Sequence, residues 1–210
     1  MPNTYCLLMY TINDVEKVIK KVQLYHDYFD EICIIDQSPQ PIYESLSDAL
    51  KKDYSSYNIK LKHVPSLGHS GPYYELGLKI ADSDYVFRLD LDESISEPLL
   101  KNLRNLNTSP AYWIRRLELT SKYYTWQLRI YKKDQIIFKG FLHDQGLPKS
   151  SAKVMDRKYH IVHHWKVSDL KNSNKLKRYL ALDLIERSLI YRFLSVKLWF
   201  SINYVCSRMF

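Results

Sequence analysis

The sequence predicts an α/β fold built on a mostly parallel sheet with helices on its faces. In the first half of the chain, short apolar runs alternate with segments whose apolar residues recur at helical spacing, and this alternation is typical of βαβ units. Residues 84–93 then form a mostly apolar run that leads directly into three carboxylates. Because open α/β sheets bind ligands beyond the carboxyl ends of their strands, these carboxylates mark a candidate site.

The N-terminal half is predicted to alternate strands with helices. Each strand is an apolar run bounded by turn residues, at residues 5–10, 31–35, 59–64 and from 84 onward. The first helix is expected to have Asn13 as its N-cap, with Glu16 three residues later as in a capping box. The other two helices are expected at residues 42–52 and around residues 74–80.

The pattern changes after the acidic residues. A helix is expected from Ser96 to about residue 106, with Pro98 in its first turn. The segments that follow are rich in aromatic and β-branched residues and predict strands at residues 111–119, 123–131, 135–138, 153–155 and 159–165. Residues 132–134 are expected to form a turn, residues 139–146 a loop, and the chain from about residue 168 helices. The second half of the sheet should therefore be mixed or antiparallel.

Several protein classes are poorly supported. The first predicted strand is not followed by Gly-x-Gly-x-x-Gly, and no P-loop motif occurs, which argues against a dinucleotide-binding fold and a P-loop NTPase. The cysteines at positions 6, 33 and 206 are far apart and lie mostly in apolar runs, so we expect buried thiols in a reducing compartment. The N-terminus does not resemble a signal peptide. We therefore expect a cytoplasmic protein.

Positive charge is concentrated in the C-terminal third. Residues 145–210 contain 13 Lys and Arg against 4 Asp and Glu, whereas the rest of the chain contains 18 against 19. This distribution argues against a nucleic-acid-binding protein and favours a localised anionic partner, either a phosphate-bearing substrate or an anionic membrane surface.

Residues 167–210 are predicted to be a basic, amphipathic helical extension. Apolar residues form two stripes at helical spacing, one through Ile185, Leu189 and Phe193 and one through Tyr191, Leu194 and Leu198. The uncharged run at residues 198–207 is too short to span a bilayer, which takes ~20 residues. We expect peripheral membrane attachment or a homodimer contact, and a helix buried between core and tail remains an alternative.

Asp90 and Asp92 are the first candidates for a metal site. One residue separates them, so on an extended chain both side chains would leave the same face. Carboxylate oxygens suit Mg²⁺ or Mn²⁺, which commonly take one or two carboxylates together with substrate phosphates. The alternative is a solvated strand end, or the acidic start of a helix, since Asp92, Glu93 and Ser94 precede a helical pattern.

The ordered motifs resemble the cytosolic, metal-dependent GT-A glycosyltransferases, most closely those of the family-two type. The matching segments span residues 4–166 and are residues 10–13, Asp36, 67–71, 84–93, 126–132, 143–144 and 161–165. The resemblance implies a Rossmann-like GT-A domain at residues 1–166. Within it, residues 1–108 would bind a nucleotide sugar and residues 109–166 would hold the acceptor.

The resemblance also implies roles for single residues. Asp92 would ligate the metal directly, and Asp90 would contact both the ribose and the metal. The other donor-binding candidates are Thr11, Asn13, Asp36 and His69. His69 stands where the family's usual loop has another residue, and Asp36 could equally be a strand-end residue that caps a turn.

An inverting transfer needs a general base, and Asp144 beside His143 is the candidate; a solvated loop carboxylate is the alternative. His163 and His164 are adjacent on a predicted strand and face opposite ways, so at most one of them can point into the site. That histidine could contact phosphate or the metal, as could His143. Arg129 could contact phosphate or form a structural ion pair. Zinc is not expected, because no set of His and Cys has a usual spacing.

The sequence therefore predicts a metal-dependent inverting glycosyltransferase that uses a nucleotide-diphosphate sugar, with Mg²⁺ or Mn²⁺ as cofactor. The acceptor, a glycan, a lipid or a protein, is left open. Two alternatives remain. One is a catalytically silent binding or assembly module of the same fold. The other is a sugar-phosphate nucleotidyltransferase, although residues 10–13 lack the glycine-rich, basic loop that this chemistry needs.

Overall fold

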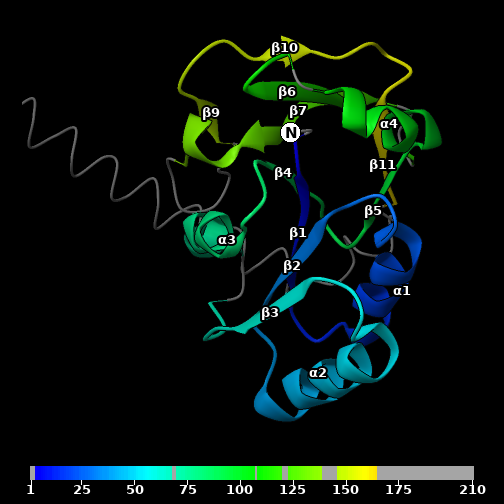
Figure 1. Ribbon diagram of the computed structural model, residues 1–210, viewed down its shortest axis with the longest axis vertical. Helices are drawn as coiled ribbons and strands as arrows, with labels where there is room; N and C mark the ends of the chain where they lie inside the picture. The colour runs from blue at the N-terminus through cyan, green and yellow to red at the C-terminus, as the bar shows by residue number, and fades with distance from the viewer. Residues whose placement is uncertain (1–2, 68–69, 107, 120–122, 139–145, 165–210) are drawn as a thin grey trace, which may run out of the picture.

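A nine-stranded mixed sheet forms the centre of the molecule in the computed structural model (Figure 1). The structure describes residues 3–67, 70–106, 108–119, 123–138 and 146–164. The strands of the main path follow the order β3-β2-β1-β4-β7-β6-β11-β5, and β10 pairs with β6.

The first half of the sheet is parallel. Its strands are β1 (Tyr5–Thr11), β2 (Glu31–Asp36), β3 (Ile59–His63) and β4 (Tyr85–Arg88). β1, β2 and β4 are buried almost throughout, which explains their continuous apolar runs. The chain goes from β1 outward to β2 and β3 and returns to the other side of β1 as β4. In open α/β sheets, ligands bind beyond the carboxyl ends of the strands at such a reversal of strand order, which here lies between β1 and β4.

Helices cover both faces of the sheet. Apolar residues of α1 (Val15–Tyr25), α2 (Gln40–Tyr54) and α4 (Glu97–Asn102) belong to one core cluster. α3 (Tyr74–Ile80) follows the short 3-10 helix η1 (Gly71–Tyr73) and packs on a second cluster. Figure 1 shows α3 on the side of the sheet opposite to α1. The two clusters confirm the predicted helix-covered sheet.

The second half of the sheet is mixed. Its strands are β5 (Glu93–Ile95), β6 (Ala111–Glu118), β7 (Tyr124–Lys132), β10 (Lys153–Val154) and β11 (His160–His163). β7 pairs antiparallel with both β4 and β6, whereas β11 lies parallel to β6 and antiparallel to β5. This register sets His163 opposite Glu118 on one side and opposite Glu93 on the other.

The remaining short elements lie outside this sheet. β8 (Ile136–Ile137) and β9 (Leu147–Pro148) pair as a separate hairpin, and β9 was not predicted. The 3-10 helix η3 (Lys133–Gln135) occupies the predicted turn before β8. The helix expected to reach residue 106 ends at Asn102 and continues only as the 3-10 helix η2 (Leu103–Asn105).

One local expectation was wrong, and one alternative for the acidic motif is excluded. Asp14, not Asn13, is the N-cap of α1, and its side chain accepts a hydrogen bond from the Lys17 amide. Asn13 adopts a φ of 58° instead, and its amide donates to the Ser38 hydroxyl. The segment after Asp92 is not the start of a helix, because Glu93 begins strand β5. Both differences come from partners distant in sequence, which local spacing does not reveal.

The C-terminal extension at residues 167–210, with Cys206, lies outside the described residues, and the two-part division of the domain stays a prediction. Cys6 and Cys33 are buried free thiols. No helix in the described part of the chain is long and apolar enough to cross a membrane.

Candidate functional site

A pocket of about 460 Å³ lies at the carboxyl ends of β1, β2 and β3. Three short segments line it, each directly after one of these strands: Ile12 and Asn13, residues 37–40, and residues 63–66. The side chain of His63 stacks on Tyr43 with ring centroids 4.4 Å apart and interacts with the Ser38 carbonyl at 2.7 Å. The size suits a small ligand, since such pockets span about 300–1,000 Å³.

Asp36 holds the wall of this pocket together. Its Oδ1 atom accepts hydrogen bonds from the amide and the hydroxyl of Ser38, at 3.0 and 2.5 Å. The Ser38 hydroxyl in turn accepts from the Asn13 amide at 2.8 Å. Asp36 is fully buried, and its other oxygen has no hydrogen-bond partner among the described residues. In the described structure Asp36 therefore acts as the turn-capping residue that the sequence offered as an alternative.

Thr11 and Asn13 occupy different positions beside the pocket. Thr11 is buried, and its hydroxyl has no hydrogen-bond partner within the described chain. Asn13 lines the pocket. The sequence prediction missed Gln37, Ser38 and His63, which also line it. Their position just after or at the end of a predicted strand was the signal that could have identified them.

The acidic motif forms a turn between β4 and β5. The Glu93 amide donates to the Asp90 carbonyl at 3.0 Å, so residues 90–93 are not the extended chain from which the shared face of the two aspartates was inferred. The side chains of Asp90 and Asp92 are 41% and 42% exposed, whereas that of Glu93 is fully buried. The turn thus presents two carboxylates to solvent at the same edge of the sheet as the pocket, since β4 neighbours β1.

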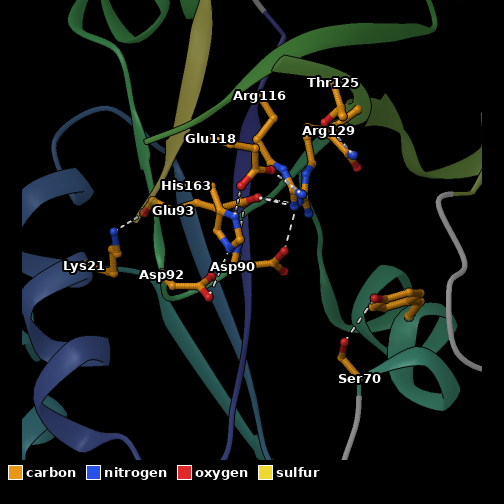
Figure 2. A network of polar contacts seen from close by, with 12 residues as sticks. Lys21, Ser70, Asp90, Asp92, Glu93, Arg116, Glu118, Thr125, Arg129 and His163 are labelled. Carbon is orange, nitrogen blue, oxygen red and sulfur yellow. Dashed lines mark hydrogen bonds and ion pairs between the residues drawn. The ribbon is translucent and has the colours of Figure 1, made fainter. Parts of the chain in front are cut away.

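Arg129 lies behind the turn and contacts two of its carboxylates. Its Nη2 atom lies 2.8 Å from Asp90 Oδ2 and 2.6 Å from Glu93 Oε1, and its side chain is 2% exposed (Figure 2). Burial by itself raises the pKa of Asp90, but the guanidinium groups of Arg129 and Arg88 outweigh it and lower this pKa to about 2. Asp90 is therefore ionised at neutral pH, and Arg129 forms the structural ion pair.

His163 links the other aspartate of the turn to β6. Its Nε2 atom lies 3.3 Å from Asp92 Oδ2, and its Nδ1 atom lies 2.6 Å from Glu118 Oε2 (Figure 2). The hydrogen bond to Asp92 is the largest cause that raises the pKa of His163, to about 9, and the bond to Glu118 adds to it. The neighbouring His164 instead contacts the Ser94 hydroxyl at 2.7 Å. The structure thus brings the imidazole of His163, and not that of His164, to the Asp92 carboxylate, while the His164 amide donates to the Asp92 carbonyl at 2.8 Å.

Glu118 and Arg116 complete a chain of charges between the two motif aspartates. Arg116 contacts Glu118 Oε1 at 2.6 Å through Nη2 and Glu93 Oε1 at 3.4 Å through Nη1. The chain of contacts therefore runs from one aspartate to the other through Asp90, Arg129, Glu93, Arg116, Glu118, His163 and Asp92 (Figure 2). The sequence prediction counted Glu93 among the three carboxylates but gave it no role, and it did not include Arg116 or Glu118, because only the pairing of β6 with β11 brings these two to the site.

The chemistry of the donors around Asp92 suits a hard divalent cation, although in the described structure Asp90, Asp92 and His163 do not bring one donor atom each within 4.8 Å of one another. Two partly exposed carboxylates and an imidazole nitrogen suit Mg²⁺ or Mn²⁺ better than a soft metal. Arg129 contacts Asp90 through Oδ2, and His163 contacts Asp92 through Oδ2.

A second group of potential ligands, Cys6, Glu31 and Cys33, is buried between β1 and β2. Glu31 is already engaged there, since Lys60 and the Ser83 amide and hydroxyl contact its carboxylate. The two thiols that remain are short of the four ligands of a structural zinc site.

Three predicted site residues, His69, His143 and Asp144, lie outside the described residues. Their proximity to Asp92 stays a prediction.

No protein-family model matches the sequence, and a search of curated proteins found no match. Solved structures do match the fold. TarS 1–349 from S. aureus superposes with a TM-score of 0.59 at 12% identity, over 76% of this chain and 60% of that one. TarS 1–349 in complex with UDP-GlcNAc gives 0.58 at 15% identity, over 78% and 59%.

The mannosyltransferase PcManGT from Pyrobaculum calidifontis, in complex with GDP-Man and Mn²⁺, gives a TM-score of 0.59 at 13% identity, over 88% of this chain and 65% of that one. This chain spans less than two thirds of each of these proteins. At such identities the likeness shows the fold, which is the GT-A fold of glycosyltransferases.

Proposed function

We propose that this protein is a metal-dependent, inverting glycosyltransferase of the family-two type. It transfers a sugar from a nucleotide-diphosphate sugar to an acceptor hydroxyl. The observation that carries the proposal is the turn with Asp90 and Asp92, which lies at the same sheet edge as the pocket beyond β1, β2 and β3. TarS 1–349 with UDP-GlcNAc and PcManGT with GDP-Man support it, because both have this fold and bind nucleotide sugars.

The pocket would hold the nucleoside. Asn13 and the segment after Asp36 form two of its walls, and Thr11 with Asp36 supports them from the buried side. The buried oxygens of Thr11 and Asp36 that lack partners among the described residues would be available to the base or the ribose after small rearrangements of the loop. His69, which precedes η1 in the sequence, would also contact the donor.

Asp92 and His163 would hold the divalent cation, with Asp90 as a further contact. When bound, the cation would stabilise the negative charge that develops on the nucleoside diphosphate as it leaves. Arg129 keeps Asp90 ionised and in place, and the hydrogen bond that His163 Nδ1 donates to Glu118 keeps the His163 ring directed at Asp92. His143, Arg129 and His164 remain weaker candidates for contacts with phosphate.

An inverting transfer needs a base opposite the leaving group. We assign this role to Asp144, which would take the proton of the acceptor hydroxyl. General-base help of this kind contributes about 10²- to 10⁴-fold in rate. The acceptor is a glycan, a lipid or a protein. The basic extension at residues 167–210 would bring the enzyme to a membrane surface or to a second copy, and we expect it to act in the cytoplasm.

A thermal-shift screen tests the donor and the metal together. The full chain is heated with UDP-GlcNAc, GDP-mannose and the corresponding nucleoside diphosphates, each with Mn²⁺ and with EDTA. A bound ligand raises the melting temperature by mass action, so one donor should stabilise the protein with Mn²⁺ and not with EDTA. The shift should disappear in Asp92→Asn and persist in Asp48→Asn, which removes an exposed carboxylate on α2.

Asp144→Asn tests the chemistry separately. It should retain the metal-dependent shift while transfer falls by about 10² or more. Donor binding that is insensitive to EDTA, or a product with the donor's anomeric configuration, would contradict the proposal.

A further inference from the structure

Glu118 is the least expected member of the charge chain at the site. Its two oxygens have different partners, Arg116 Nη2 at 2.6 Å on Oε1 and His163 Nδ1 at 2.6 Å on Oε2. The parallel pairing of β6 with β11 sets Glu118 directly opposite His163. The side chains of both residues are mostly buried, with 18% and 16% exposed. The imidazole therefore has a fixed partner on one nitrogen and Asp92 on the other.

The geometry points to Glu118 as a positioning residue: it requires a proton on Nδ1 of His163 and so leaves Nε2 as the nitrogen that faces Asp92 and the cation. A carboxylate offers only acceptors, so the nitrogen in contact with it must donate. In the metal-free protein Nε2 faces the Asp92 carboxylate and therefore also carries a proton; a cation at Asp92 would displace this proton, because Glu118 retains the one on Nδ1. This inference rests on the proposed function, because His163 would be a ligand only if a cation binds at Asp92.

Arg116 makes the inference sharply testable. Arginine has only donors, so the atom of residue 118 that faces Arg116 has to be an acceptor. In Glu118→Gln, the amide oxygen would therefore face Arg116 and the amide NH₂ would face His163. Nδ1 would then accept a hydrogen bond, and the ring would carry only the proton on Nε2, which points at Asp92. The variant keeps the size of the side chain and reverses the direction of one hydrogen bond.

The first measurement uses the metal-free protein. Long-range ¹H–¹⁵N spectra of the full chain with ¹⁵N-labelled histidine report which ring nitrogen is protonated, and the His163→Gln spectrum identifies the His163 signals. Wild type near pH 7 should show both ring nitrogens protonated, because each of them faces a carboxylate. Glu118→Gln should show the Nε2–H form, with the Nδ1 resonance moved to the position of an unprotonated nitrogen. The same protonated Nδ1 in both proteins would overturn the inference.

The second measurement is Mn²⁺ affinity, read from the electron paramagnetic resonance of free Mn²⁺. Partners that orient a ligating histidine typically change metal affinity by about 10- to 100-fold. Glu118→Gln should weaken Mn²⁺ binding by at least about 10-fold and remove the histidine ¹⁴N coupling from the spin-echo spectrum. Glu97→Gln makes the same change in an exposed ion pair with Lys101 on α4. It should leave the Mn²⁺ affinity and the ¹⁴N coupling unchanged.

A double variant separates orientation from charge. In Arg116→Gln/Glu118→Gln the donor-only arginine is gone, so the amide at 118 can rotate and present its oxygen to His163. Mn²⁺ affinity and the ¹⁴N coupling should recover to those of the single variant Arg116→Gln. Comparison with this single variant cancels the direct effect of losing Arg116. An affinity as weak as that of Glu118→Gln, or weaker, would show that only the charge of Glu118 matters and would overturn the inference.

The two proposals can fail separately. If wild type binds no Mn²⁺, the metal site of the proposed function is wrong, while the metal-free spectra still decide the role of Glu118. If wild type binds Mn²⁺ and the nucleotide but Glu118→Gln matches it in all readouts, the inference alone is wrong. The free energy of unfolding of each variant, from urea denaturation, shows that a loss of affinity is not a loss of fold.

Discussion

The Nε2 atom of His163 lies 3.3 Å from Oδ2 of Asp92, although 71 positions separate the two residues in the chain. The contact joins the last strand of the described domain to the turn that follows β4. It also selects one histidine of an adjacent pair, because His164 contacts Ser94 instead.

The adjacent histidines provide a matched test of the metal site. We expect His163→Gln to weaken Mn²⁺ binding by about 10-fold or more, since it removes a nitrogen ligand, and His164→Gln to leave it within about twofold. Calorimetric titration of each full-length variant measures this difference. Equal losses in both variants would exclude a specific role for His163.

Removal of Arg129 should destabilise the fold itself. Arg129→Met leaves the fully buried Glu93 without its closest cation, and an uncompensated buried charge typically costs about 3–5 kcal/mol. Urea denaturation should show this decrease in the free energy of unfolding. Arg104→Met removes a half-exposed arginine paired with Asp30 and should cost about 1 kcal/mol or less. Adding Glu93→Gln to Arg129→Met should recover part of the loss, and a loss unchanged by it would contradict the explanation.

A bulky residue in the pocket should separate nucleotide binding from metal binding. Ser66 is exposed at the pocket wall, so Ser66→Trp should fill part of the space without disturbing the core. Binding of the preferred nucleoside diphosphate should weaken at least about tenfold, which corresponds to about 1.4 kcal/mol. Fluorescence titration measures it, with Ser56→Trp, an exposed position outside the pocket lining, as the control. Unchanged nucleotide affinity in Ser66→Trp would show that the nucleoside binds outside this pocket.

Glu31 should make stability depend on acid pH. Its buried carboxylate lies 2.5 Å from Lys60 Nζ and accepts hydrogen bonds from the Asp82 and Ser83 amides. Burial raises its pKa, but these partners outweigh burial and hold the pKa below its ordinary 4.5. Because the folded pKa is the lower one, the stabilisation is fully present above about pH 4.5 and is lost as the pH falls through the folded pKa.

The measurement is the free energy of unfolding at about pH 7 and at successively lower pH values. Wild type should lose more stability over this range than Glu31→Gln, which has no proton to take up at this position. Glu97→Gln, at an exposed ion pair, should retain the wild-type pH dependence. Parallel curves for wild type and Glu31→Gln would show that Glu31 does not titrate in this way.

Local patterns in the sequence determined the α/β class, the alternation of four strands and three helices in the first half, and the candidate status of Asp90, Asp92 and His163. These features depend on side-chain periodicity and on turn residues, which act over a few positions of the chain. Strand alternation also implied that the side chains of His163 and His164 would face opposite ways.

Only the tertiary structure decided what surrounds these residues. The pairing of β11 with β5 and β6 brings Glu93, Glu118 and His163 together, and β7 brings Arg129 to the same turn. The displaced N-cap of α1 has the same origin, since the Ser38 hydroxyl accepts from the Asn13 amide, and Arg129 pairs with the Asp90 side chain in the turn at residues 90–93. Such contacts join residues from 25 to 71 positions apart, and no local periodicity encodes which distant side chain will satisfy a buried charge.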